Sequence, residues 1–157
     1  MSGLVKVRVH DAVYEAVDAN LAAGTLVIPS ATATESGLPG IAAAGATALN
    51  CIGVAAKDCV TAANRAALES GTTAAPMSAP FVDASIPTAT TTVYDEGWFK
   101  LQYATGTAVA RGDRVKCAAG GLVTKWVSGT DSAAAIIGRC AEAVGTGGGT
   151  ALTRIDV

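Results

Sequence analysis

Chemically reactive side chains are scarce in this chain of 157 residues. It contains a single histidine, 4% aromatic residues and 15% charged residues, whereas charged residues usually make up about 25% of a protein. The histidine, His10, falls on the polar side of an alternating segment with Lys6 and Arg8. A catalytic imidazole would need a carboxylate or a nucleophile beside it. We therefore expect no catalytic residues, and an enzyme is the least favoured of our hypotheses.

The cysteines lack the C-x-x-C spacing that is typical of zinc and redox sites. They are separated by 8, 58 and 23 residues, at positions Cys51, Cys59, Cys117 and Cys140. We interpret them as free thiols that pack as small hydrophobic side chains, with a disulfide or a metal site as the less favoured alternative. The prediction is that the protein binds no metal and no cofactor.

Neither nucleic acid nor a membrane is an expected partner. The formal net charge is −2 and no cluster of Lys and Arg is interleaved with aromatic residues, which disfavours binding to a polyanion. The uncharged stretch 36–56 is long enough to span a membrane, but it is rich in alanine and contains four glycines and a proline. Met1 leads directly into an alternating segment, without the basic start and apolar core of a secretion signal. We therefore expect synthesis in a cytoplasm.

The two halves of the chain are weakly similar. Glycines recur between short apolar runs at separations of 88, 84, 84 and 85 residues, in the pairs Gly24/Gly112, Gly37/Gly121, Gly45/Gly129 and Gly53/Gly138. Glycine at fixed points of such runs marks turns that need a positive φ. The pattern predicts two related β-meanders, pseudo-repeats 13–60 and 99–144, within a single domain over 1–157. Residues 61–92 form a connector or arm between them.

Short alternating segments predict a mainly β fold. Valine alternates with polar residues near the start, at Val5, Val7 and Val9, which indicates a strand with one buried face. About ten such segments at the spacing of a barrel or sandwich predict a compact β-barrel or sandwich of short strands, with at most one short helix. That helix is expected from Thr61 to Ser70, with Thr61 as its N-cap. Asp95-Glu96-Gly97 is expected to form the turn of a hairpin.

Two tryptophans offer candidate contact points. Trp98 and Trp126 each fall in a predicted strand, where burial is the more common outcome. An Arg111-Gly112-Asp113 tripeptide also matches a cell-adhesion motif. Its equivalent in the first half is Ala23-Gly24-Thr25, so we interpret the glycine turn as the shared feature and the charges as incidental.

The second half carries several short motifs in a fixed order. After a strand from Val93 to Leu101 with an internal glycine come Gly112-Asp113-Arg114-Val115, Gly120-Gly121-Leu122-Val123, Ile137-Gly138-Arg139-Cys140 and a terminal strand to Val157. This order, over residues 93–157, resembles the small capsid decoration, or cement, proteins of tailed bacteriophages. The resemblance implies a structural virion protein on the outer surface of the capsid. Such a protein binds the major capsid protein, bridges its subunits and stabilises the expanded head.

The resemblance leaves open a monomer or a trimer on the capsid. We expect contact with the shell or with other copies through the N-terminal strand or the arm at 71–92, because each is an edge that needs covering. The candidate interface residues are Val5, Lys6, Val7, Arg8, Phe81, Trp98 and Trp126. The competing hypothesis is a receptor- or glycan-binding β module on a virion or cell surface, with Trp98, Tyr103 or Trp126 as stacking platforms.

Overall fold

The structure is a computed structural model that describes residues 8–34, 36–69 and 89–157. These residues form nine strands and one α-helix, joined by turns and loops. The strands are β1 (Arg8–Ala16), β2 (Leu26–Ser30), β3 (Gly40–Ala43), β4 (Gly53–Ala55), β5 (Thr90–Tyr103), β6 (Arg114–Ala118), β7 (Leu122–Lys125), β8 (Gly138–Cys140) and β9 (Gly149–Asp156). The helix is α1 (Ala62–Glu69), and two 3₁₀ turns are η1 (Ala119–Gly121) and η2 (Ala133–Ala135). Within the described ranges, no helix has the length and apolar character needed to cross a membrane. The predicted mainly β fold is confirmed.

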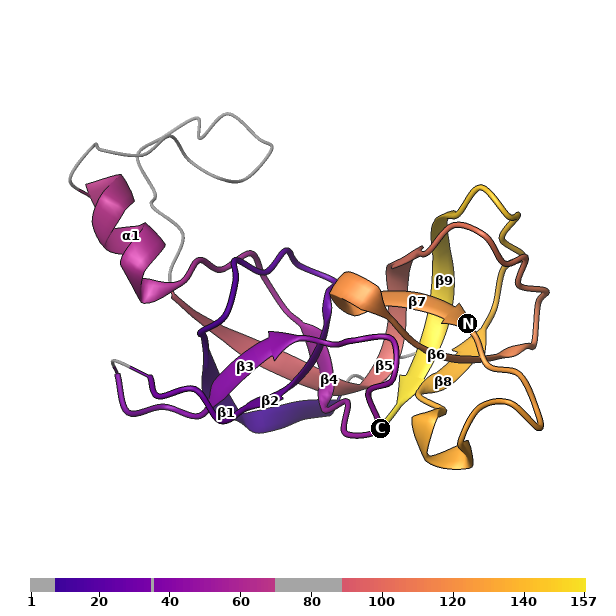
Figure 1. The fold of residues 1–157 in the computed structure, drawn as a ribbon, viewed down its shortest axis with the longest axis horizontal. Helices are drawn as coiled ribbons and strands as arrows, with labels where there is room; N and C mark the ends of the chain where they lie inside the picture. Colours follow the sequence, from indigo (N-terminus) through magenta and orange to yellow (C-terminus); the bar gives the residue numbers. More distant parts are fainter. Residues whose placement is uncertain (1–7, 35, 70–88) are drawn as a thin grey trace, which may run out of the picture.

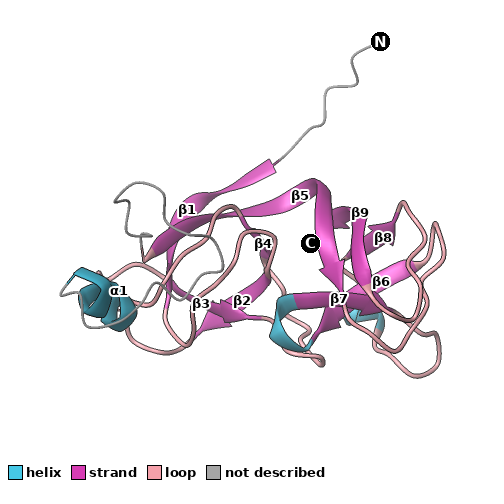
Figure 2. Cartoon of the chain, turned by 90° about the horizontal axis from the view of Figure 1, so that it is seen from above, coloured by secondary structure: helices cyan, strands magenta, loops and turns pink. Residues whose placement is uncertain are grey.

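The strands close into two rings of five that share β5. In the first ring, pairing runs β1–β3–β2–β4–β5 and returns to β1; in the second it runs β5–β7–β6–β8–β9 and returns to β5. Residues 90–96 of β5 pair with β1, and residues 96–103 pair with β9. Figure 1 shows β1–β4 on one side and β6–β9 on the other, with β5 passing through both groups, and Figure 2 shows the same arrangement from above. One continuous strand therefore holds the two rings together.

Both rings have the same strand order and the same strand directions. In each ring the first and third strands pair in parallel, β1 with β3 and β5 with β7, and every other neighbouring pair is antiparallel. The register also corresponds, since Val27 pairs with Gly53 in the first ring and Val115 with Gly138 in the second. The two related units of the predicted fold class are thus visible in the pairing. Each is a closed ring and not the predicted meander, because its first strand pairs with its third strand instead of its second.

A glycine is required at the same point of each ring. A Cβ on Gly53 would lie 2.1 Å from the carbonyl oxygen of Tyr94, and a Cβ on Gly138 would lie 1.8 Å from that of Arg154. Both contacts join the fourth strand of a ring to its last strand. Only a residue without a side chain allows these backbones to approach so closely.

The predicted hairpin at Asp95-Glu96-Gly97 is wrong. β5 runs through this segment without interruption, and burial alternates on either side of it. Glu96 is paired with Arg8 of β1 and with Asp156 of β9. Hydrogen bonding to partners on both sides therefore overrides the local preference of an Asp-Glu-Gly sequence for a turn.

The helix begins where the sequence predicts. The Thr61 hydroxyl oxygen accepts a hydrogen bond from the backbone N–H of Asn64 at 3.3 Å, which is the contact of an N-cap. The Asn20 side chain supports the same helix end, because its oxygen accepts from the Thr61 N–H at 3.0 Å and from the Asn64 side chain at 3.0 Å. In Figures 1 and 2, α1 lies at the end of the first ring that is away from the second ring.

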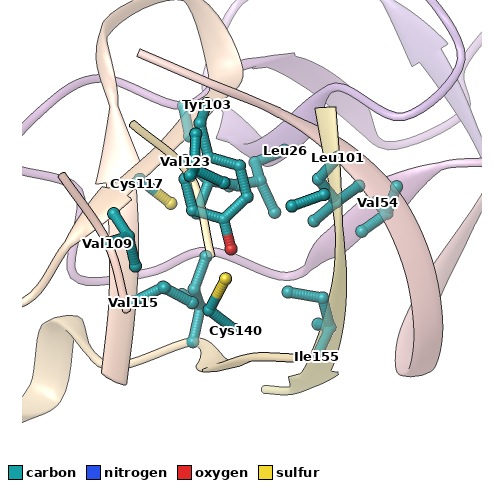
Figure 3. Close-up of a cluster of buried hydrophobic side chains, with 14 residues drawn as sticks. Leu26, Val54, Leu101, Tyr103, Val109, Val115, Cys117, Val123, Cys140 and Ile155 are labelled. Carbon is teal, nitrogen blue, oxygen red and sulfur yellow. The ribbon is translucent and has the colours of Figure 1, made fainter. Parts of the chain in front are cut away.

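The rings pack directly against one another. The buried cluster of the second ring includes Leu26, Ala44 and Val54, which belong to the first ring, and Figure 3 shows Leu26 and Val54 beside Leu101. The adjoining turn η1 reaches across as well, because the N–H of Gly121 donates to the carbonyl oxygen of Ala44 at 2.8 Å. The outer face of the first ring at β2 and β4 is therefore covered by the second ring.

We expect Gly121→Ala to destabilise the protein much more than Gly120→Ala. Both glycines have a φ of +73°, so each substitution adds the strain of a left-handed backbone, about 1–2 kcal/mol. A Cβ on Gly121 would also lie 2.2 Å from Thr25 Cγ2 and 2.7 Å from the carbonyl oxygen of Leu26, whereas a Cβ on Gly120 meets nothing within 4 Å. Thermal unfolding followed by circular dichroism measures the difference. Equal Tm values for the two variants would contradict the close packing of η1 on β2.

Candidate functional site: an arginine row on the second ring

The residues that the sequence proposed for the interface fall into two groups. Val5, Lys6, Val7 and Phe81 lie outside the described residues, and Arg8 begins β1. Trp98 lies on β5 with 43% of its surface exposed, and Trp126 directly follows β7 and is half-buried. Of the seven candidate residues, the structure therefore gives the side-chain exposure of Trp98 and Trp126 alone.

Tyr103 is not available as a stacking platform. It is buried in the core of the second ring, and its hydroxyl forms a hydrogen bond of 2.7 Å with the Thr153 hydroxyl. Burial raises the pKa of Tyr103 above its ordinary value, because an apolar surrounding disfavours the phenolate. Figure 3 shows its ring among the other buried side chains of this cluster.

Three arginines occupy directly opposite positions on neighbouring strands of the second ring. Arg114 of β6 pairs with Arg139 of β8, and Arg139 pairs with Arg154 of β9. Residues that are directly opposite share one face of a sheet. All three line one open hollow of about 360 Å³, together with Ile136, Gly138 and Asp156. We call these three residues the arginine row.

A tryptophan lies at each end of the arginine row. Trp98 is directly opposite Arg154 in the pairing of β5 with β9. At the other end, the backbone N–H of Trp126 donates to the carbonyl oxygen of Arg114 at 2.9 Å. The Arg114 guanidinium lies over the indole, 5.5 Å from the ring centroid, which is a cation–π contact. The two tryptophans that the sequence singled out are thus joined by three arginines that it did not propose as site residues.

Each arginine could be recognised as exposed from the sequence, but their proximity could not. Each lies on the outward side of an alternating strand, and all three are exposed in the structure. Their proximity depends on β6 lying next to β8, with β7 on the far side of β6. That order does not follow from the order of the strands along the chain, so the row was missed.

The loop that carries Trp126 is held in place by Asp131. The Asp131 carboxylate accepts hydrogen bonds from the Lys116 ammonium and from the Val127 N–H, the latter at 2.7 Å. The indole N–H of Trp126 donates to the carbonyl oxygen of Ser132 at 2.9 Å. The Lys116 ammonium holds the pKa of the Asp131 carboxyl below its ordinary value, because it stabilises the carboxylate. These contacts fix Trp126 where Arg114 can lie over it.

The arginine row concentrates positive charge on a protein whose net charge is −2. Within the described ranges, the row's single ion pair joins Arg154 to Asp156 at 3.9 Å, between side chains that are 52% and 66% exposed. Arg139 donates from Nη1 to the carbonyl oxygen of Gly112 at 3.1 Å. Like charges on directly opposite positions destabilise a sheet. The row therefore has a local electrostatic cost that the neighbouring side chains offset only in part.

The Arg-Gly-Asp tripeptide belongs to a turn. Asp113 accepts a hydrogen bond from the Ala110 N–H at 2.8 Å and pairs with Lys125 at 2.8 Å, so its carboxylate is engaged within its own ring. Gly112 has a φ of 88°, and Gly24 at the same point of the first ring has a φ of 85°. The structure thus supports the interpretation that the glycine turn is the shared feature.

All four cysteines are free thiols. Cys51 of the first ring and Cys117 of the second are hydrogen-bonded through their side chains, and this contact lowers the pKa of the Cys51 thiol. Burial raises the pKa of Cys59 to about 11. Across residues 8–34, 36–69 and 89–157, no group of three or more His, Cys, Asp or Glu side chains is placed to hold a metal ion.

The comparisons with known proteins show a likeness of fold. No protein-family model matches the chain, and no curated protein matches it. Among solved structures, the chain is similar to the N base of the head fiber gp8.5 in bacteriophage phi29, with a TM-score of 0.53 and 15% sequence identity. The match covers 96% of this chain and 95% of that chain. At this identity, the likeness concerns the fold alone.

Asp131→Asn should lower stability at neutral pH and flatten its dependence on pH. Because the pKa of the folded-state carboxyl is lowered, the ion pair adds stability above the ordinary Asp pKa of about 3.9 and loses it as the pH falls through the folded-state value. Asn keeps an acceptor for the Val127 N–H, so the substitution isolates the charge. We expect the wild type to have the higher Tm at about pH 7 and the two proteins to converge toward about pH 2.

Asp156→Asn is the matched control, since its ion pair with Arg154 is long and exposed and such pairs contribute little. Thermal unfolding over this pH range compares the three proteins. Parallel curves of Tm against pH for the wild type and Asp131→Asn would contradict the role given to Lys116.

The cysteines should differ strongly in reactivity. We expect iodoacetamide to alkylate Cys51 first at about pH 8, because the thiolate is the reactive form and Cys51 combines a lowered pKa with partial exposure. Cys59 is buried and has a raised pKa, so it should react only after unfolding. Peptide mass spectrometry against a urea-unfolded control measures the order, and faster labelling of Cys59 than of Cys51 in the folded protein would contradict it.

Proposed function

We propose that this protein is a structural component of a bacteriophage virion that binds the outer surface of the head. The observation that carries the proposal is the fold shared with the phi29 head fiber base, since it extends over nearly the full length of both chains. The order of motifs in residues 93–157, which resembles capsid decoration proteins, supports the same conclusion independently of the fold. The finer proposal is that the protein bridges major capsid subunits and stabilises the expanded head.

The two-ring architecture is suited to bridging. Because β5 is hydrogen-bonded in both rings, a force applied to one ring passes to the other through a continuous strand. Two rings so joined offer separate faces to neighbouring capsid subunits. When many copies bind around a shell, their individually modest contacts together give a large stabilisation of the head. The N-terminal strand and the arm at 71–92 remain proposed contacts with the shell, or with other copies in a trimer.

A receptor- or glycan-binding role is the second candidate, and the exposure of Trp98 is the observation that favours it. Its 43% exposed side chain lies on a β surface, as a sugar-stacking residue would. Trp126 is less suited, because Arg114 already lies over its ring. Binding of the isolated protein to a glycan array, lost in Trp98→Ala, would favour this candidate over the first.

The expected outcome of a direct test is that the purified protein co-sediments with expanded heads of the phage that encodes it. Heads that carry the protein should also release their DNA at a higher temperature than bare heads, because bridged subunits separate less easily. A fluorescent dye that binds exposed DNA measures that temperature. Unexpanded proheads and the heads of an unrelated phage are the controls.

The two parts of this test separate the coarse proposal from the fine one. Binding to heads without a higher DNA-release temperature would contradict the bridging role, but the proposal of a virion protein that binds the head would stand. An absence of co-sedimentation at every salt concentration would contradict binding to the head itself.

A further inference from the structure

We propose that the arginine row receives the acidic face of a helix on the partner protein. This inference names the chemistry of the partner and so rests on the proposed function. It goes beyond that function because it assigns a specific surface of the second ring.

The same positions of the first ring are occupied by apolar residues that the second ring covers. Leu26 pairs with Val54, and Val54 pairs with Tyr94, in the register in which Arg114, Arg139 and Arg154 are paired. Leu26 and Val54 are buried in the cluster that spans the two rings. Tyr94 stacks on Phe99, with ring centroids 5.7 Å apart, and Phe99 packs against the same cluster. This face of a ring is therefore a docking face where the chain supplies its own partner.

In the second ring the equivalent face carries arginine, and all three arginine side chains are exposed. A polar outer face is what an end repeat needs in order to stay soluble, and alternating charges would meet that need without repulsion. The row instead places three like charges opposite one another, which costs stability. Guanidinium groups pair strongly with carboxylates. Asp156 lines the same hollow and, among the described residues, pairs with Arg154, which leaves positive charge in excess at the row. That excess is explained by an anionic partner rather than by solubility alone.

The spacing of the row fits an acidic helix. Neighbouring strands lie about 4.8 Å apart, and side chains three or four residues apart on a helix are about 5–6 Å apart. Alternate residues of an extended strand are spaced more widely, at about 6.6 Å. Glutamates at every third or fourth position of a helix would thus meet successive arginines across the hollow. Trp98 and Trp126 would bound the contact at its two ends and exclude water from it.

A nucleic acid fits this surface less well. The protein carries a net charge of −2, which repels a long polyanion beyond the immediate contact. The row is short, since it crosses only three strands. A single acidic face is the partner that matches a local positive surface on a mildly acidic protein.

The test measures binding of a labelled helical peptide to the full chain. The peptide carries glutamate at every fourth position of one face, and a matched peptide carries glutamine there. Fluorescence anisotropy gives the affinity, and emission from the two tryptophans reports contact at the row. We expect the glutamate peptide to bind, the glutamine peptide not to bind, and added salt to weaken the complex.

Arg139→Gln should weaken peptide binding about tenfold, the change expected when one charge-assisted contact is lost. Arg65→Gln is the matched control: it removes the same charge from α1, on the first ring, and should bind as the wild type does. Arg154→Gln is a second variant, and the Tm of each variant shows that it is folded. Equal weakening by Arg139→Gln and Arg65→Gln would overturn the inference, as would a failure of the wild type to bind.

Three further probes distinguish the class of partner. Inorganic phosphate, a heparin fragment and a single-stranded oligonucleotide are titrated in the same way, and tighter binding of any of them than of the glutamate peptide would overturn the assignment. The outcome is separable from the proposed function. If heads bind the wild type and Arg139→Gln equally, the inference is overturned and the proposed function stands. If the glutamate peptide binds but heads do not, the proposed function is overturned and the acidic-helix specificity of the row stands.

Discussion

The structure depends on one strand, β5, whose two halves are hydrogen-bonded to different partner strands. β5 has β1 and β4 beside its first half, and β9 and β7 beside its second half. At Glu96 the two sets of partners meet, because this residue is paired on both sides. A sheet edge left open at either ring would expose unpaired backbone groups, and closure of both rings on the same strand removes that exposure. The rings are therefore parts of a single hydrogen-bonded system.

Duplication of a ring fixes the backbone and leaves the surface free to differ. The inward positions keep their character: Val27 and Val115, at the same register point, are both fully buried. The outward positions do not, since Leu26 is buried against the second ring and Arg114 is exposed. A buried position is limited by volume and polarity, whereas an outward position is limited only by what it touches. The difference between the rings thus records what covers each of them.

Local signals in the sequence predicted local features of the fold. Period-two alternation predicted strands. The glycine offsets predicted that Gly24 and Gly112 form equivalent turns in the two rings, and Thr61 was correctly identified as a helix cap. The hairpin at Gly97 was wrong because its turn preference is local and the pairing that overrides it comes from distant strands. The tryptophans were identified, but the arginines between them were not, because their proximity depends on strand order. The loops also shift the repeat: β3 and β7 correspond at an offset of 82 residues, as Ala43 and Lys125 show.

The distribution of charge bears on how such a protein would select its partner. A surface rich in alanine with few charges gives little long-range attraction or repulsion, so contact area alone would discriminate poorly among protein surfaces. A short row of guanidinium groups adds a directional requirement, because each group needs a carboxylate in its plane. Electrostatic complementarity of this kind contributes more to specificity than to affinity. The face of the first ring that carries Leu26 and Val54 is buried against the second ring. In the proposed complex, the equivalent face of the second ring would then be the one that distinguishes one partner from another.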